Sequence, residues 1–261
     1  MLLMSRWRKS KALFPYVWML LGLAAFTLAW HGASRLWGPL LVATPAETGA
    51  AVLRLFASPA GQLSLYQTLA RVAVALVLQV VVGAALGMLA GFYPWFEELL
   101  RPAISVLISV PPVAVALFVI FVSGGGELQV VATAVALGLP LLYRGAVAAV
   151  RTLDRDLLEM LRVYRVSRVR QLRTMYLPAT LYALLPSILL AAGLTIRLMI
   201  MAEIIVGIER GIGPALSLAR VHMATADIFA WMLTMAAIVL LIEGLLLHVV
   251  RTHVLSWQTR R

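Results

Sequence analysis

The chain has 261 residues, of which 62% are hydrophobic and only 13% are charged, and its net charge is +11. A soluble globular domain is about half apolar and about a quarter charged, so this composition excludes an ordinary soluble domain and indicates a protein embedded in a lipid bilayer. The chain has no cysteine, which excludes disulfides, thiolate nucleophiles and cysteine-ligated metals.

Six apolar segments are long enough to be membrane-spanning helices, because a span needs about 18 or more apolar residues whose backbone groups pair within the helix. They cover residues 14–30, 70–92, 102–122, 128–150, 179–206 and 228–250. The basic start and first apolar run also resemble a signal peptide, but no convincing small-residue cleavage site follows. The sequence therefore predicts an all-α integral membrane protein with six transmembrane helices.

The spans divide the chain into three regions. Residues 1–60 contain an N-terminal tail, the first transmembrane helix and an external segment. Residues 61–250 form the core, which includes a charged loop at 151–178, and residues 251–261 form a basic tail. No hydrophilic stretch is long enough for a separate soluble domain.

The positive charges predict the orientation of the spans, because cytoplasmic loops of membrane proteins are enriched in Lys and Arg. With a cytoplasmic N-terminus, sixteen of the 22 Lys and Arg residues lie on the cytoplasmic side, and Arg197 lies within the fifth span. We therefore expect both termini in the cytoplasm. The basic residues flank the spans and form no recognisable binding module, so we expect no nucleic-acid partner.

Glycines and prolines mark the second to fourth spans. Gly83, Gly87 and Gly91 recur at four-residue intervals, which allows another helix to approach closely. We interpret this series as helix packing rather than as a substrate site. Pro111 and Pro140 are expected to kink the third and fourth spans or to free backbone groups locally.

A charged, amphipathic stretch at 156–178 separates the fourth and fifth spans. Its first part has a helical apolar stripe beside Glu159, and Ser167 suits the N-cap of a second short helix that runs to Met175. Pro178 then fits the first turn of the next span. The stretch predicts a helix–turn–helix elbow at the inner membrane surface. A solvated basic loop on anionic lipid headgroups is the alternative.

The elbow resembles the Glu-Ala-Ala signature loop of binding-protein-dependent ABC importer permeases. In that family the triplet is followed by a glycine and, after a fixed interval, by Leu-Pro. Here Glu159, Met160 and Leu161 occupy the triplet, and Leu177 and Pro178 close the motif at the family interval.

The resemblance extends over about residues 60–250. Ser167 and Arg168 match residues that are common after the family glycine, "ISVPPVAVALFVIF" with Pro111 resembles the third helix, and "AEIIVGIERGIGPAL" resembles the segment after the fifth. The chain is most similar to the nitrate, sulfonate and taurine branch of the family.

One departure concerns the turn of the elbow, where Arg165 stands at the position of the family glycine. A β-carbon strains a tight turn, although an arginine can also turn the chain without a positive φ. The resemblance implies that the elbow couples the spans to an ATPase. The coupling residues that it implies are Asp156, Glu159, Met160, Leu161, Arg162, Arg165, Ser167 and Arg168.

The resemblance also implies a type I ABC importer permease fold, with six transmembrane helices and a coupling elbow, in the bacterial cytoplasmic membrane. It implies a homodimer in contact with lipid, a dimer of ATPase subunits that binds ATP-Mg, and an extracytoplasmic substrate-binding protein. The only lysines are Lys9 and Lys11 in the N-terminal tail, so no Gly-Lys-Ser/Thr phosphate loop exists in the chain. We expect ATP hydrolysis on a separate chain, and neither a metal nor a cofactor in this one.

Two ionisable residues of the fifth span are candidates for the substrate pathway, because charges within a span are costly and usually face a cavity or a partner. Arg197 and Glu203 are six residues apart, so each needs a partner elsewhere. Arg197 suits an anionic substrate or a structural charge, and Glu203 suits a structural or gating role. The candidate pathway residues are Ser109, Pro111, Arg197 and Glu203.

Three function classes remain open from the sequence. The first is the permease subunit of an ABC importer for a small, anionic solute, working by ATP-driven alternating access. The second is a self-contained secondary transporter or channel, for which no internal repeat is evident. The third is a membrane enzyme or scaffold, for which the four scattered histidines offer no catalytic cluster.

Overall fold

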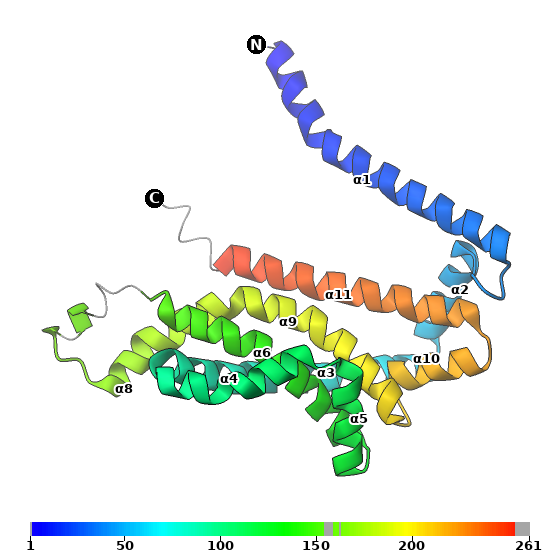
Figure 1. The fold of residues 1–261 in the computed structure, drawn as a ribbon. Coiled ribbons are helices and arrows are strands. Elements are labelled where there is room, and N and C mark those ends of the chain that lie inside the picture. The colour runs from blue at the N-terminus through cyan, green and yellow to red at the C-terminus, as the bar shows by residue number, and fades with distance from the viewer. Residues whose placement is uncertain (1, 154–158, 162, 254–261) are drawn as a thin grey trace. The chain divides into compact units, whose positions relative to one another are not determined.

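The structure, a computed structural model, describes residues 2–153, 159–161 and 163–253, and all regular structure within these residues is helical (Figure 1). The elements are α1 (Leu2–Trp37), α2 (Pro45–Ala57), α3 (Pro59–Phe92), α4 (Pro94–Ser109), α5 (Pro112–Ser123), α6 (Glu127–Arg151), α8 (Arg168–Gln171), the π-helix η1 (Leu172–Tyr176), α9 (Leu177–Val206), α10 (Ile212–Val221) and α11 (Thr225–His253).

The chain forms two compact units. The smaller unit comprises Met1–Pro59 with Leu218–Thr234, and the larger comprises Ala60–Ser217 with Met235–Arg261. The larger unit contains the elbow and all the candidate pathway residues.

Trp30 joins three segments of the smaller unit. Its indole nitrogen donates a 2.9 Å hydrogen bond to the backbone oxygen of Ala43, and its ring stacks on Phe229 with centroids 5.6 Å apart. Helix α2 begins with a capping box, in which Thr44 and Glu47 each accept the other's backbone N–H. The backbone hydrogen bond from Thr44 holds the pKa of the Glu47 carboxyl below its usual range.

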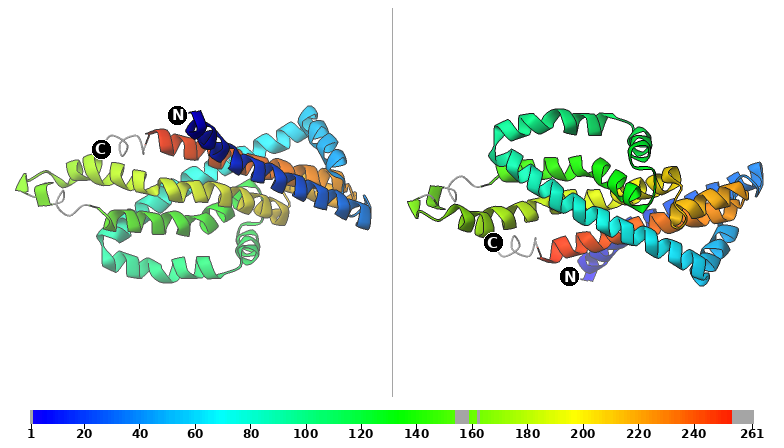
Figure 2. Two further views of the ribbon diagram at one scale, coloured as in Figure 1. Left: turned by 90° about the horizontal axis from the view of Figure 1, so that it is seen from above. Right: turned by 90° about the horizontal axis from the view of Figure 1, so that it is seen from below.

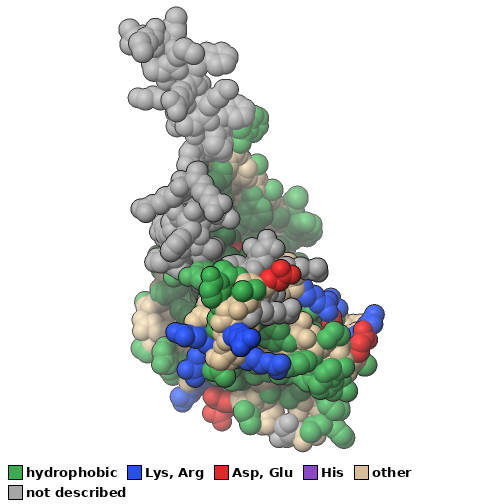
Figure 3. All heavy atoms as spheres, turned by 90° about the vertical axis from the view of Figure 1, so that its left-hand side faces the viewer, with side chains coloured by type: hydrophobic (Ala, Val, Ile, Leu, Met, Phe, Trp, Pro, Cys, Tyr) green, Lys and Arg blue, Asp and Glu red, His purple; other side chains and the backbone are tan. Residues whose placement is uncertain are grey.

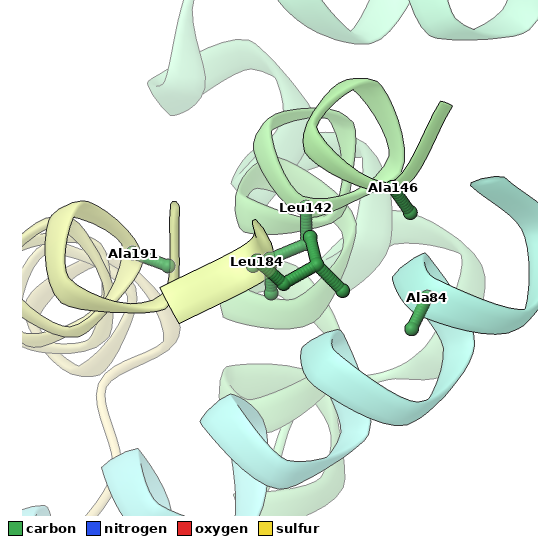
Figure 4. Close-up of a cluster of buried hydrophobic side chains, with 5 residues drawn as sticks. All are labelled: Ala84, Leu142, Ala146, Leu184 and Ala191. Atoms are coloured by element: carbon green, nitrogen blue, oxygen red, sulfur yellow. The ribbon is translucent and has the colours of Figure 1, made fainter. Parts of the chain in front are cut away.

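The core of the larger unit lies where α3, α6 and α9 meet. Figure 4 shows Ala84 from α3, Leu142 and Ala146 from α6, and Leu184 and Ala191 from α9 gathered in one cluster of buried side chains. Seen from below, α3 crosses in front of α6 and α9, which run side by side (Figure 2). Small residues dominate this cluster, which lets the three helix backbones approach closely.

The glycine series of the second span confirms the prediction of close helix packing. A β-carbon at Gly83 would lie 2.8 Å from the β-carbon of Leu142, and one at Gly87 would lie 2.5 Å from that of Ala146. Gly91 is equally crowded by α6. The glycines therefore face α6 in register, one helical turn apart.

The predicted spans match helices of membrane-crossing length. Five single helices qualify, and a bent pair, Pro94–Ser109 with Pro112–Val122, makes a sixth span if it is counted as one. The single helices are Val17–Trp37, Pro59–Phe92, Glu127–Arg151, Arg168–Val206 and Thr225–Leu245. The first apolar helix extends seven residues beyond the predicted end at residue 30.

The third span contains the sharpest bend. Helices α4 and α5 meet at 108° (Figure 1), and Val110 and Pro111 between them are extended, with ψ of 133° and 134°. Two successive prolines produce this break, because a residue before proline avoids the helical region. The expected kink therefore occurs at Pro111, whereas α6 continues through Pro140.

The larger unit has two functional ends. We call the end that carries residues 159–171 the elbow end, at the α8 label in Figure 1. The opposite end, which carries the loops 124–126 and 207–211, is called the far end.

Candidate functional site

The elbow consists of a helical segment at 159–161, a turn, and the start of α8. Glu159, Met160 and Leu161 are helical, as the resemblance to the permease triplet implies. The predicted coupling residues Asp156 and Arg162 lie outside the described residues.

The turn of the elbow has the longer of the two hydrogen bonds of a Schellman motif. The amide of Val166 donates to the carbonyl of Leu161 at 3.0 Å, five residues back. Before it, the amide of Tyr164 makes an ordinary helical bond to the carbonyl of Met160 at 3.0 Å. Arg165 therefore occupies the position that usually carries glycine, and its φ is +50°. The alternative that arginine turns the chain here without a positive φ is wrong, since the bond from Val166 to Leu161 requires the left-handed residue between them.

Ser167 stands at the N-cap of α8 as predicted, but its hydroxyl makes no capping hydrogen bond. The second helix also does not end at Met175. It widens into the π-helical turn η1 and continues into α9, so that Arg168–Val206 is one helix. Pro178 has no amide to donate to the preceding turn, and a local π-bulge accommodates this loss.

The elbow end exposes positive charge and apolar surface together. The arginines at 165, 168, 170 and 173 are exposed, and none of the five ion pairs found among the described residues includes them. Val163 and Tyr164 beside the turn are 78% and 75% exposed. Figure 3, which views the larger unit from its elbow end, shows Lys and Arg side chains among hydrophobic ones. Such a surface suits an acidic partner.

At the far end, four side chains form an ion cluster, which we define as Thr68, Arg71, Glu127 and Glu203. The Glu127 side chain is 72% exposed, and the other three residues are buried. Glu203 is fully buried and accepts a 2.8 Å bond from Arg71 Nη1 and a 2.8 Å bond from the Thr68 hydroxyl. Arg71 Nη2 also donates to Glu127 at 2.8 Å. The cluster therefore links α3, α6 and α9, and the expectation that Glu203 finds its partner on another helix is confirmed.

The loop 207–211 and the first residues of α10 close over this cluster. The amide of Gly213 donates to Glu203 Oε2 at 2.9 Å, and the amide of Ile212 donates to the Thr68 hydroxyl at 2.9 Å. Gly211 has a φ of +143° and would place a β-carbon 2.7 Å from the Glu203 carboxylate, so only glycine fits. Glu203 is enclosed on all sides by protein groups.

Arg197 has the opposite surroundings. It is exposed, and no described carboxylate lies within ion-pair distance, although residues on either side of it in α9 are buried. It lies on an exposed stripe of α9 that is otherwise apolar and includes Leu190 and Ile204. Ser109 and Pro111, at the bend before α5, are exposed too. The structure therefore leaves three of the four candidate pathway residues accessible and buries Glu203.

A polar junction in the core was missed at the sequence level. Gln79 is fully buried in α3, donates a 2.8 Å bond to the Ala134 carbonyl, and accepts a 2.8 Å bond from Thr195 of α9. Because Gly138 has no side chain, it leaves room for the side-chain amide of Gln79. A lone glutamine in an apolar run is the available signal, because an amide within a span needs partners.

Glu243 of α11 packs against α9 at a second glycine. A β-carbon at Gly193 would lie 2.6 Å from Glu243 Oε1. Gly193 is four residues before Arg197, so this carboxylate lies one turn of α9 from the exposed arginine.

Sequence comparisons agree with these features. Residues 83–257 match the family of inner membrane components of binding-protein-dependent transport systems. A bicarbonate transport system permease protein of Synechococcus elongatus is 28% identical over 92% of this chain and 89% of its own length. A Bacillus subtilis protein named for aliphatic sulfonate transport is 29% identical over 68% of this chain and 62% of its own.

A riboflavin transport system permease protein of Chloroflexus aurantiacus is 30% identical over 56% of this chain. The match covers 54% of that relative's own length, so the chain spans just over half of it. The family match covers about two thirds of the chain, and it includes the elbow, α6, α9 and α11. The chain is therefore a multi-pass inner membrane protein and a transport subunit, and it belongs to the family of binding-protein-dependent ABC transporter permeases.

Proposed function

We propose that the chain is the transmembrane permease subunit of an ABC importer that moves a small anionic solute by ATP-driven alternating access. An extracytoplasmic binding protein delivers the solute, and a pair of ATPase subunits on the cytoplasmic side binds ATP-Mg. Family membership favours this function over a self-contained secondary transporter or channel. The observation that carries the ATP-driven part is the geometry of the elbow.

The elbow stands away from the lipid at the end of a long helix. Arg168–Val206 is one helix of 39 residues, which is about 58 Å long at about 1.5 Å per residue. A complete bilayer is about 40–45 Å thick, and a typical tilt of about 20° shortens the span of this helix only to about 55 Å. Because the basic residues lie at the elbow end, that end is the one that extends into water, where a soluble ATPase can bind it.

Arg197 supports an anionic solute. It is an unpaired, exposed cation within an apolar stripe of a membrane helix, and such groups mark ion or substrate pathways. Two of the relatives described above are named for anions, bicarbonate and sulfonates. Ser109 and Pro111 are proposed as pathway residues on the α4–α5 side. Glu203 is proposed to hold the far end closed rather than to contact the solute.

We further propose that a second copy of the chain covers the apolar face of α5. Leu117, Phe118 and Phe121 on this helix are 55%, 66% and 90% exposed. A homodimer would place two elbows on two ATPase subunits, one each. The remaining apolar surface would contact lipid.

The test is co-purification with the cognate ATPase in mild detergent. We expect wild type to retain the ATPase, whereas Glu159→Ala and Leu161→Asp lose it, because both change the helical face of the elbow. Glu98→Ala serves as the control, since Glu98 is exposed at the elbow end outside the turn. A folded wild type that retains no ATPase would refute the proposal.

A further inference from the structure

We infer that Arg165 is the residue by which this permease selects its ATPase, through an ion pair with a carboxylate on the ATPase surface that receives the elbow. The inference rests on the proposed function and adds a specificity-determining contact to it. Its basis is the backbone of the turn, the surroundings of the side chain and the charge of the elbow end.

The backbone of the turn disfavours arginine. The hydrogen bond from Val166 to Leu161 closes the turn only when the residue between the two helices is left-handed, and Arg165 has a φ of +50°. Glycine reaches this conformation without cost, whereas a β-carbon collides with the neighbouring carbonyl. An arginine here therefore weakens the elbow relative to glycine.

Nothing in the described part of the chain compensates for this cost. The Arg165 side chain is exposed, and neither a hydrogen bond nor an ion pair to a described residue involves it. The turn itself is held by backbone bonds and by Gln171, whose amide donates to the Val166 carbonyl at 2.8 Å. The guanidinium is therefore free to contact a partner outside the chain.

The charge of the elbow identifies the chemistry of that partner. Arg168 and Arg170 of α8 and Arg173 of η1 follow Arg165 after the turn, all are exposed, and none pairs with a described carboxylate. Guanidinium groups bind carboxylates through paired hydrogen bonds. Val163 and Tyr164 supply apolar contact beside the charge. This combination fits an acidic protein surface with an apolar floor.

Anionic lipid would offer the same charge, but the geometry favours a protein. The 39-residue helix Arg168–Val206 is longer than a bilayer is thick, so its basic end and the turn beyond it project past the headgroups. Arg165 is farther from the start of α9 along the chain than Arg168, Arg170 and Arg173 are. A lipid contact is therefore an outcome of the test rather than the inference.

A charge at the tip of the turn discriminates between ATPases. An ATPase with a carboxylate opposite Arg165 gains an ion pair, whereas one with a neutral or basic group buries an unpaired guanidinium or is repelled. A glycine at position 165 would tolerate an acidic, a neutral or a basic group on the ATPase. Arg165 would thus restrict the permease to an ATPase with a matching acid.

The test compares variants of the full-length permease for affinity to the cognate ATPase in detergent at low and high salt. Arg165→Gly and Arg165→Asn relax the left-handed turn but remove the charge, and Arg165→Lys keeps the charge. Arg220→Gln is the control, because it makes the same change of net charge at an exposed arginine of α10, outside the elbow. Binding to vesicles with and without anionic phospholipid is measured in parallel.

We expect Arg165→Gly and Arg165→Asn to weaken binding by about tenfold at low salt, equivalent to about 1.4 kcal/mol, while the thermal stability of the permease stays equal or rises. Arg165→Lys and Arg220→Gln should lose little affinity for the ATPase. Arg165→Glu should bind again to an ATPase in which one acidic residue of the docking surface is changed to arginine.

Equal or tighter binding of Arg165→Gly would overturn the inference while leaving the proposed function intact, because the elbow would still bind the ATPase. A loss confined to anionic vesicles would assign Arg165 to lipid and would also overturn it. A folded wild type that binds no ATPase would refute both.

Discussion

Glu203 and Arg197 lie six residues apart on α9, yet their surroundings differ completely. Glu203 is fully buried and receives bonds from Arg71, Thr68 and the amide of Gly213. Burying two charges costs several kcal/mol, which the hydrogen bonds to both carboxylate oxygens of Glu203 offset, although the Nε of Arg71 is buried without a partner. Arg197 has no such partner among the described residues, which supports the proposal that its charge meets an anionic solute.

Removing the buried carboxylate should destabilise the protein strongly. Glu203→Gln leaves Arg71 buried beside a neutral amide, and loss of one member of a buried pair costs about 3 kcal/mol. Thermal unfolding in detergent measures the loss. Glu98→Gln, which breaks the exposed pair with Arg101, is the control and should cost less than about 1 kcal/mol. Equal effects of the two changes would contradict the role of the cluster.

Neutralising Arg197 should impair transport without impairing folding. In proteoliposomes that hold the complete assembly, Arg197→Gln should lower uptake of an anionic solute at least about tenfold, and Arg197→Lys should lower it less, since a lost contact to a charged ligand costs about 1.5–3 kcal/mol. Labelled bicarbonate and a labelled alkylsulfonate are the probes. Arg220→Gln, at another exposed arginine, is the control. Wild-type uptake of these anions by Arg197→Gln would exclude an anion-binding role.

At the scale of elements, small residues and prolines determine how the helices meet. The glycines of α3 bring its backbone onto α6, and the prolines at 111–112 turn α5 away from α4 by 108°. Both effects come from missing atoms, a β-carbon in one case and an amide hydrogen in the other. Neither the glycines of α3 nor the prolines at 111–112 can be replaced by a residue of similar polarity.

A methyl group between α3 and α6 should separate the helices. Gly87→Ala places its β-carbon 2.5 Å from both the Ala146 β-carbon and the Tyr143 carbonyl oxygen, and overpacking of this kind costs about 1–3 kcal/mol. Gly244→Ala is the matched control, because no atom lies within 4 Å of its added β-carbon. The thermal midpoint of the control should stay the same or rise. An unchanged midpoint for Gly87→Ala would show that the α3–α6 contact is loose.

At the scale of the whole molecule, function depends on the side of the membrane on which each end of the larger unit lies. The proposed orientation places the elbow end in the cytoplasm with the ATPases and the far end outside with the binding protein. The ion cluster then secures the loop on the outer side, and the exposed arginines project on the inner side. Movement of the ATPases would displace the elbow and, because Arg168–Val206 is one helix, would shift α9 with it.

The natural absence of cysteine makes this orientation directly measurable. Single-cysteine variants at Glu209 and Tyr164 mark the far end and the elbow, and both side chains are exposed. A membrane-impermeant thiol reagent should label Glu209→Cys in intact spheroplasts and should label Tyr164→Cys only after lysis. The reverse pattern would invert the topology and would exclude ATPase binding at the elbow from the cytoplasm.

The existence of the spans, the elbow and the glycine contact was predictable from the sequence. Each depends on local properties: the length of an apolar run, a change of composition at 156–178, or a four-residue repeat such as Gly83, Gly87 and Gly91. Two local details were nevertheless wrong, since Ser167 makes no capping bond and the helix does not stop at Met175. The helix continues past Met175 because the π-helical turn before Pro178 accommodates the amide hydrogen that proline lacks.

The sequence by itself determined an all-helical membrane protein, since burial in lipid is decided by the apolar length of each segment. Only the tertiary structure decided that Glu203 is paired while Arg197 has no ion-pair partner among the described residues, because the partner of Glu203 is Arg71, 132 residues away. It also decided that Arg165 adopts a left-handed conformation, which depends on hydrogen bonds across the turn and not on the preference of arginine. Which charges meet is a property of helix placement in space, and no local pattern encodes it.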